Sequence, residues 1–135
     1  MDSAQLDALV GDWLTLPDLA ERLDLPVAKV RRLVEERRLV GVRRGEPAVY
    51  AVPARFLVPG HLANPAQPGT PDGAPEWTVL AALQGTFTLL ADVGFDDAAA
   101  LAWLFTPDDS LAGTPLDALL AGRKSEVRRL AQAEL

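Results

Sequence analysis

The chain of 135 residues contains no cysteine and a single histidine, His61. The lack of cysteine excludes disulfides, thiolate metal sites and a cysteine nucleophile. His61 lies in a proline-rich stretch without a plausible set of partner residues, so a role as catalytic base is not expected. The sequence also lacks a glycine-rich phosphate loop and a Ser/His/Asp set. We therefore expect a protein that is not an enzyme and that binds no cofactor or metal.

Long apolar runs are missing as well. No stretch reaches the roughly 18 residues that a membrane-spanning helix needs, and the acidic N-terminus lacks the basic region of a signal peptide. We therefore expect a cytoplasmic protein without membrane contact. With 135 residues, of which 49% are hydrophobic, the chain is long enough for one domain or two very small ones.

Positive charge is scarce over the whole chain, whose net charge is −6. Such a balance argues against a general nucleic-acid coat protein. The basic residues are concentrated between Lys29 and Arg55, where eight basic and three acidic residues give a local net charge of +5, whereas residues 61–135 carry −6. The local field decides where a phosphate group docks. A nucleic-acid contact is therefore expected between residues 29 and 55.

Residues 14–52 have the pattern of a helix-turn-helix motif followed by a wing. The first helix is predicted to begin near Thr15, with Asp18 completing a capping box three residues later. Asp24-Leu25-Pro26 predicts the turn between the two helices, since proline can start the second one. A short amphipathic helix over residues 3–13 is predicted to cover one side of this unit.

The second helix is predicted over residues 27–37. Its core stripe consists of Val30, Leu33 and Val34. The residues outside that stripe near the N-terminal end are small or cationic, and this end enters the major groove in helix-turn-helix proteins. They are Val27, Ala28, Lys29, Arg31 and Arg32.

A β-hairpin follows, with strands predicted over residues 40–44 and 48–52 around Gly45-Glu46-Pro47. Arg43 and Arg44 lie near its tip, where two guanidinium groups could reach a phosphate or a minor groove. The apolar residues of both strands are expected mostly in the core, namely Val40, Val42, Val49 and Tyr50.

The segment 59–75 holds five prolines and three glycines, which predicts a linker or long surface loop without regular structure. We therefore expect a winged helix-turn-helix domain over residues 1–58 and a helical domain over residues 76–135. Within the second domain, helices are predicted over about 77–92, after Asp96, after Thr114 and from about Lys124. The expected fold class is mostly α with a small β wing.

Two parts of the sequence resemble known families. Residues 14–57 resemble the winged helix-turn-helix of the excisionase and MerR-like class, in the pattern Leu-Thr-x-x-Asp-Leu-Ala-x-x-Leu, a short turn, Val-x-x-Leu-Val and an arginine-tipped hairpin. Residues 102–122, AWLFTPDDSLAGTPLDALLAG, followed by EVRRLAQA, are similar to the C-terminal domain of a family of small actinobacterial DNA-binding regulators. They are more distantly similar to the toxin-binding domain of certain antitoxins. The shared features are a Trp-Leu pair, a Pro-Asp turn and a glycine before a proline-led, leucine-rich helix.

The resemblance implies sequence-specific binding to double-stranded DNA through the second helix and the wing. Arg31 and Arg32 are the leading candidates for reading bases, and Val27 or Ala28 could contact a thymine methyl group. Carried over by position, the DNA-contacting residues are Val27, Ala28, Lys29, Arg31, Arg32, Arg43 and Arg44.

The leading hypothesis is a DNA-binding transcriptional regulator. The main alternative is a protein-interaction module, an antitoxin-like partner binder that acts through residues 76–135. The same region could form a homodimer, because a single small reading module gains limited affinity for DNA. A small-molecule sensor is a third hypothesis, and it requires a pocket.

Overall fold

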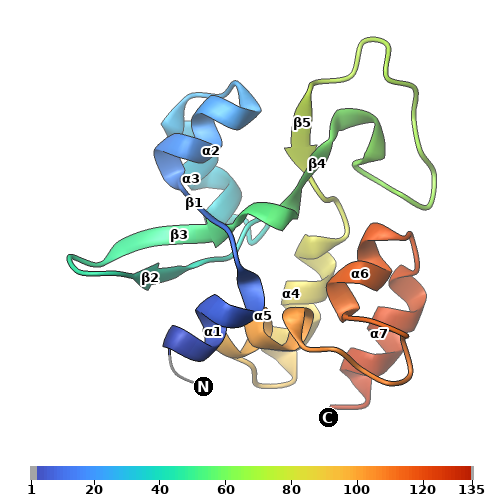
Figure 1. Ribbon diagram of the computed structural model, residues 1–135. Helices are drawn as coiled ribbons and strands as arrows, with labels where there is room; N and C mark the ends of the chain where they lie inside the picture. Colours follow the sequence, from blue (N-terminus) through green and yellow to red (C-terminus); the bar gives the residue numbers. More distant parts are fainter. Residues whose placement is uncertain (1–2, 135) are drawn as a thin grey trace.

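The computed structural model describes residues 3–134. Its α-helices are α1 (Ser3–Val10), α2 (Leu16–Leu23), α3 (Val27–Glu35), α4 (Leu83–Asp92), α5 (Asp97–Phe105), α6 (Pro115–Leu120) and α7 (Lys124–Gln132). Its strands are β1 (Trp13–Thr15), β2 (Val42–Arg44), β3 (Val49–Pro53), β4 (Leu57–Pro59) and β5 (Trp77–Val79), with 3-10 turns η1 (Ala54–Phe56) and η2 (Gly60–Leu62). The predicted fold class, mostly α with a small β wing, is confirmed (Figure 1). No helix among these residues is long and apolar enough to cross a membrane.

The helix-turn-helix forms where local sequence rules place it. The Thr15 hydroxyl accepts from the Asp18 amide at 3.4 Å, and the Asp18 carboxylate accepts from the Thr15 amide at 3.3 Å. This is the predicted capping box, and it starts α2. Asp24 adopts a left-handed conformation with φ of 55° and ends α2, and Pro26 caps α3. The helix α3 ends at Glu35, two residues earlier than predicted, because Arg37 turns left-handed with φ of 62°.

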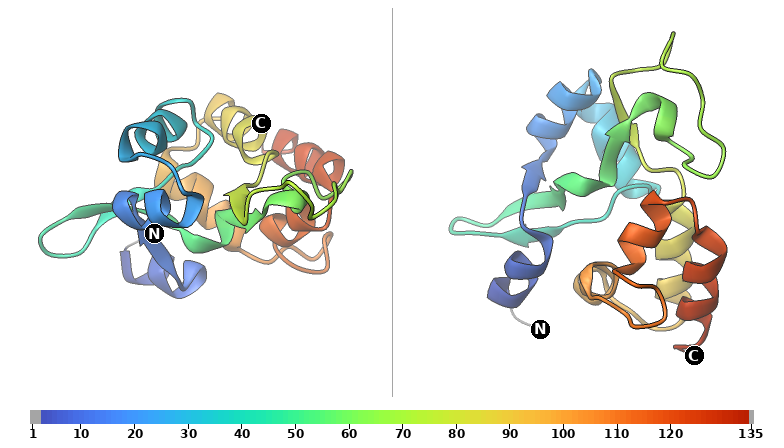
Figure 2. Two further views of the ribbon diagram at one scale, coloured as in Figure 1. Left: turned by 90° about the horizontal axis from the view of Figure 1, so that it is seen from above. Right: turned by 45° about the vertical axis from the view of Figure 1, so that its right-hand side comes forward.

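The wing belongs to a three-stranded antiparallel sheet with the order β1-β3-β2. Strand β1 was not predicted, since a helix was expected up to residue 13. The helix stops at Val10 because Gly11 has a φ of 83°, and Trp13–Thr15 then pairs with Ala51–Pro53. The β2–β3 hairpin was predicted, and it projects from the rest of the molecule in every view (Figures 1 and 2).

A second sheet closes the proline-rich segment. Strand β4 pairs antiparallel with β5, so the helix predicted from residue 77 begins only at Leu83. The chain must approach itself closely here, because a Cβ atom on Gly60 would lie 2.0 Å from the Pro75 carbonyl oxygen. Apart from Pro59 in β4 and the turn η2, residues 59–75 are irregular, as predicted. They form a surface loop whose two ends are held together by the sheet (Figure 1).

The two halves of the chain share one hydrophobic core. The buried Phe56 of η1 lies against Phe87 of α4 and Phe105 of α5, with ring centroids 5.7 and 6.0 Å apart. Helix α1 packs against α5, far away in the sequence (Figure 1). A single cluster of buried side chains runs through both halves, so the domain boundary at residues 59–75 stays a prediction made from composition.

An ion pair at the junction makes stability depend on pH. The Asp117 carboxylate accepts from Arg55 at 2.7 Å and from the Thr114 amide at 3.1 Å, and these hydrogen bonds, that of Arg55 foremost, lower the pKa of Asp117. A carboxyl group whose pKa is lower in the folded state stabilises the fold above its unfolded pKa of about 3.9. That contribution is lost as the pH falls towards the folded pKa.

We therefore expect Asp117→Asn to lower the free energy of unfolding at pH 7 by about 1 kcal/mol or less, as for a largely exposed pair. The difference from the wild type should close as the pH falls below about 4 and the native carboxyl group becomes protonated. Urea unfolding at several pH values measures this, with Asp109→Asn as the control at an exposed aspartate. A difference independent of pH would show that the Asp117 charge does not contribute.

Candidate nucleic-acid interface

Helix α3 presents an exposed face with three cations on its first two turns. Val30 is fully buried, and Val27, Leu33 and Val34 are half-buried against the rest of the motif. On the other side, Ala28 and Arg32 are exposed and lie one turn apart, so they share the centre of the face. Lys29 and Arg31 are exposed on either flank of this centre.

The N-terminal end of α3 is the part most suited to a phosphate. The N-cap residue Pro26 supplies no side-chain hydrogen bond, which leaves amide groups of the first turn for another acceptor. The positive end of the helix dipole lies there as well. At the other end, the exposed Glu35 repels phosphate. The favourable approach is therefore over the first two turns of α3.

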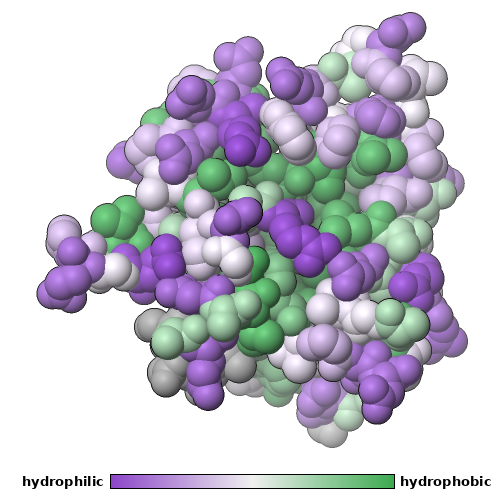
Figure 3. All heavy atoms as spheres, in the orientation of Figure 1, coloured by the Kyte–Doolittle hydropathy of each residue, from purple (hydrophilic) through white to green (hydrophobic). Residues whose placement is uncertain are grey.

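The wing separates the two arginines that the sequence places side by side. In Figure 3 the wing projects from the body and is covered mainly by hydrophilic residues. Neighbouring side chains of a strand point to opposite faces, and Arg43 is exposed whereas Arg44 lies against α1 and β1. The Arg44 guanidinium pairs with Asp7 at 2.8 Å and lies 4.8 Å from the centre of the Trp13 ring. The hydrogen bond from Arg44 lowers the pKa of the Asp7 carboxyl group.

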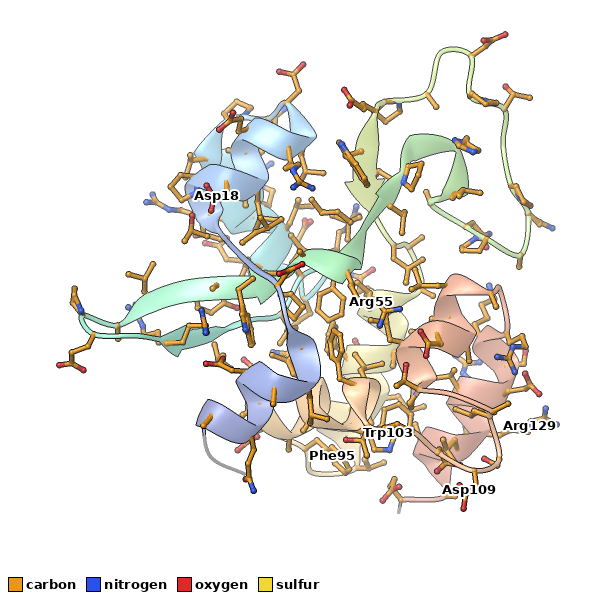
Figure 4. The ribbon with its side chains drawn as sticks, viewed as in Figure 1. Asp18, Arg55, Phe95, Trp103, Asp109 and Arg129 are labelled. Atoms are coloured by element: carbon orange, nitrogen blue, oxygen red, sulfur yellow. The ribbon has the colours of Figure 1, made fainter. Side chains whose placement is uncertain are left out.

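The cations between residues 29 and 55 fall into two groups. Within residues 4–134, Lys29, Arg31, Arg32 and Arg43 form no ion pair and no side-chain hydrogen bond. Four other arginines are paired with carboxylates, and Figure 4 shows one of them, Arg55, at the junction of the two halves. The pairs are Arg37–Asp97 at 2.7 Å, Arg38–Glu36 at 3.5 Å, Arg44–Asp7 at 2.8 Å and Arg55–Asp117 at 2.7 Å. Between residues 29 and 55 the unpaired cations are thus confined to α3 and the wing. Outside this segment, Arg22 of α2 lies 5.5 Å from the centre of the Trp77 ring and, within the described residues, forms no ion pair.

One wing residue was placed wrongly by the sequence analysis. Val49 was expected mostly in the core, yet it is 49% exposed, the largest exposure of a large hydrophobic side chain among the described residues. It stands at the start of β3 beside the turn, beyond the reach of the core that buries Ala51 and Val52. Its position next to Gly45-Glu46-Pro47 was the signal available in the sequence, since residues flanking a projecting turn lose core contacts.

Comparison with known proteins gives a consistent result over both halves. A family model described as the winged helix-turn-helix domain of DNA-binding protein Rv2175c matches residues 3–57. A second model, described as the Rv2175c C-terminal domain of unknown function, matches residues 80–134. A relative named DNA-binding protein Rv2175c, from Mycobacterium tuberculosis, is 37% identical over an alignment 130 residues long. The match covers 87% of this chain and 77% of the relative. The NMR structure of Rv2175c superimposes with a TM-score of 0.67 at 34% identity, covering 90% of this chain and 80% of the other.

Proposed function

The chain belongs to the family of the DNA-binding protein Rv2175c, and from this premise we propose that it is a transcriptional regulator that binds double-stranded DNA. Mycobacterium tuberculosis is an actinobacterium, so the resemblance to small actinobacterial DNA-binding regulators is confirmed. The observation that carries the proposal is the set of unpaired cations on α3 and the wing. Elsewhere between residues 29 and 55 the arginines are held by carboxylates, which leaves this set for phosphates and bases.

Helix α3 enters the major groove with its first two turns in this proposal. Arg32, at the centre of the exposed face, and Arg31 beside it donate to base edges, where guanine offers two acceptors to one guanidinium. Lys29 contacts a phosphate near the helix N-terminus, and Ala28 lies against the bases. Val27 is half-buried on the inner side of α3, so its contact with DNA stays a prediction. Phosphate contacts supply most of the affinity, and base contacts supply the specificity.

The wing contributes a second contact in this proposal. Arg43 binds a backbone phosphate. The exposed Val49 stands opposite Arg44 in the hairpin, so it lies on the other face of the wing from Arg43. Arg44 holds the wing against α1 through Asp7, so its predicted contact with DNA requires a phosphate to take the place of that carboxylate. Arg44 therefore contributes less to DNA affinity than Arg43.

The salt dependence of binding tests the proposal. The logarithm of the affinity falls linearly with the logarithm of the salt concentration, and each phosphate contact makes this slope steeper by about 0.9 for duplex DNA. We expect wild-type binding, followed by fluorescence anisotropy on a duplex of random sequence, to fall steeply with salt. Arg43→Ala should make the slope shallower by about 1, because one phosphate contact is lost.

The matched control is Arg129→Ala, which removes the same charge from an exposed position on α7. It should leave the slope at the wild-type value. Absence of binding at low salt would contradict the proposed function, and an equal slope for Arg43→Ala would contradict the role of the wing.

A role on chromosomal DNA implies a cytoplasmic location. Contact with a second copy or with another protein through residues 76–135 stays a prediction, as does the alternative of a protein-interaction module. Light scattering of the complex with one and with two adjacent binding sites would measure whether two copies bind together.

A further inference from the structure

The C-terminal half contains a pocket that the proposed contact with DNA does not use. It lies between α4 and α7, and its volume is about 270 Å³. The two helices pack against each other (Figures 1 and 2). Pockets for drug-sized ligands measure about 300–1,000 Å³, so this one suits a smaller molecule. It is a separate site from the basic face of α3.

The charges that line the pocket have one sign. Lys124 and Arg128 stand one turn apart on α7, both are exposed, and the lining residues include no carboxylate. Within residues 4–134 neither cation forms an ion pair or a side-chain hydrogen bond. The neighbouring Arg123, in contrast, pairs with Glu126 at 3.3 Å. Two adjacent unpaired cations at a hollow favour an anion.

The remaining lining of the pocket combines hydrocarbon groups with two hydroxyl groups. Its hydrocarbon lining comes from Ala82, Leu89, Val127 and Ala131. Of the two hydroxyl groups in the lining, that of Thr86 donates to the Ala82 carbonyl at 3.0 Å, so its proton is already used. The Ser125 hydroxyl is the one that can donate to a ligand. The chemistry therefore combines an anionic head, held by α7, with a short hydrocarbon part.

A glycine of α4, Gly85, forms part of the pocket wall. Gly85 lies inside a helix, where glycine is less favourable than alanine. Neither its backbone nor its surroundings require it, because its φ is not positive and a Cβ atom there would meet nothing within 4 Å. The residue therefore lowers helix stability without a packing reason, and a larger side chain at this position would project into the open space of the pocket.

From these observations we propose that the pocket between α4 and α7 binds a small organic carboxylate with a short hydrocarbon chain. The carboxylate lies between Lys124 and Arg128 and accepts from the Ser125 hydroxyl. The hydrocarbon part lies against Leu89 and Val127. The site gives the protein a means of sensing a metabolite, a property that does not depend on the contact between α3 and DNA.

An NMR titration of the full chain without DNA tests the proposal. Hexanoate is the probe, hexanol carries the same chain without the charge, and inorganic phosphate carries charge without the chain. We expect hexanoate to shift amide resonances of residues 85–89 and 124–131 with a dissociation constant of about 1 mM, the affinity of a ligand with few heavy atoms. Hexanol and phosphate should bind at least about tenfold more weakly.

Three variants locate the site. Lys124→Ala/Arg128→Ala should weaken hexanoate binding about tenfold or more, since it removes both partners of the carboxylate. Gly85→Leu should do the same by filling the pocket with the charges intact, and its amide spectrum reports whether the fold is kept. Arg129→Ala, on the same helix outside the pocket, should bind like the wild type.

The proposal is overturned if hexanoate gives no saturable shifts, or if the pocket variants bind it as well as the wild type does. Equal binding of phosphate would mean a general cationic surface, and equal binding of hexanol an apolar groove. Shifts of the same amides by duplex DNA but not by hexanoate would assign this surface to nucleic acid. Each of these results contradicts a carboxylate site.

Discussion

Replacement of both Arg31 and Arg32 by alanine is expected to weaken binding to double-stranded DNA by roughly tenfold or more at moderate salt. Both side chains are exposed on α3, and within the described residues neither has a carboxylate partner, so their loss removes no ion pair within the fold. The loss in affinity therefore measures contact with DNA. Each good bidentate contact with a base contributes about 1–3 kcal/mol of discrimination.

The control for this variant has the same change in net charge. Arg128→Ala/Arg129→Ala removes two exposed arginines from α7, in the other half of the chain. If DNA were attracted only by the net charge of the protein, both double variants would lose the same affinity. We expect the α7 variant to retain nearly all of it, as measured by anisotropy at one salt concentration. Unchanged affinity of the α3 variant would remove α3 as the reading helix.

A high-affinity operator, obtained by selection from random DNA, would distinguish the residues of α3 that read bases from those that contact phosphates. A residue that reads a base contributes to the difference in affinity between the operator and random DNA, whereas a phosphate contact contributes equally to both. Arg32→Ala should therefore reduce this difference, and Lys29→Ala should weaken binding to both sequences alike. The distinction follows from their positions, since Arg32 lies at the centre of the exposed face and Lys29 at its flank.

The parts of the fold that the sequence predicted are those determined locally. The Thr15–Asp18 capping box, the turn before Pro26 and the inner face around Val30 depend on residues within a few positions of each other. The sequence therefore predicted α2, α3 and the hairpin, with errors of about two residues at their ends. The resemblance to a family of small DNA-binding regulators rested on the same local motifs and on the Trp103–Gly122 pattern.

The parts that were missed depend on contacts between distant residues. Strands β1 and β5 have three residues each, and they form because β3 and β4 offer them hydrogen bonds. Arg43 and Arg44 look equivalent in the sequence, and only the fold brings Asp7 to one of them. The pocket between α4 and α7 likewise joins residues about 40 positions apart, which no linear pattern indicates.

Phe56→Ala is expected to have the largest effect on stability, lowering the free energy of unfolding by about 3–5 kcal/mol. Phe56 is fully buried and its ring contacts Phe87 and Phe105, which belong to the other half of the chain. The variant opens a cavity where the helix-turn-helix unit meets the helical half. Small domains typically retain only about 5–15 kcal/mol of stability, so the loss is a large part of the total.

The same variant tests whether the two halves unfold together. Because one core runs through both, we expect far-UV circular dichroism and amide resonances of α2 and α7 to report a single urea transition, shifted equally in Phe56→Ala. Phe95→Ala is the matched control, since Phe95 is only half-buried (Figure 4). It should lower the free energy of unfolding by less than Phe56→Ala does. Separate transitions, with α7 unaffected by Phe56→Ala, would mean that residues 1–58 and 76–135 are independent domains. A shared transition would mean that the reading helix and the pocket between α4 and α7 belong to one cooperative unit, so that a ligand stabilising one half also stabilises the other.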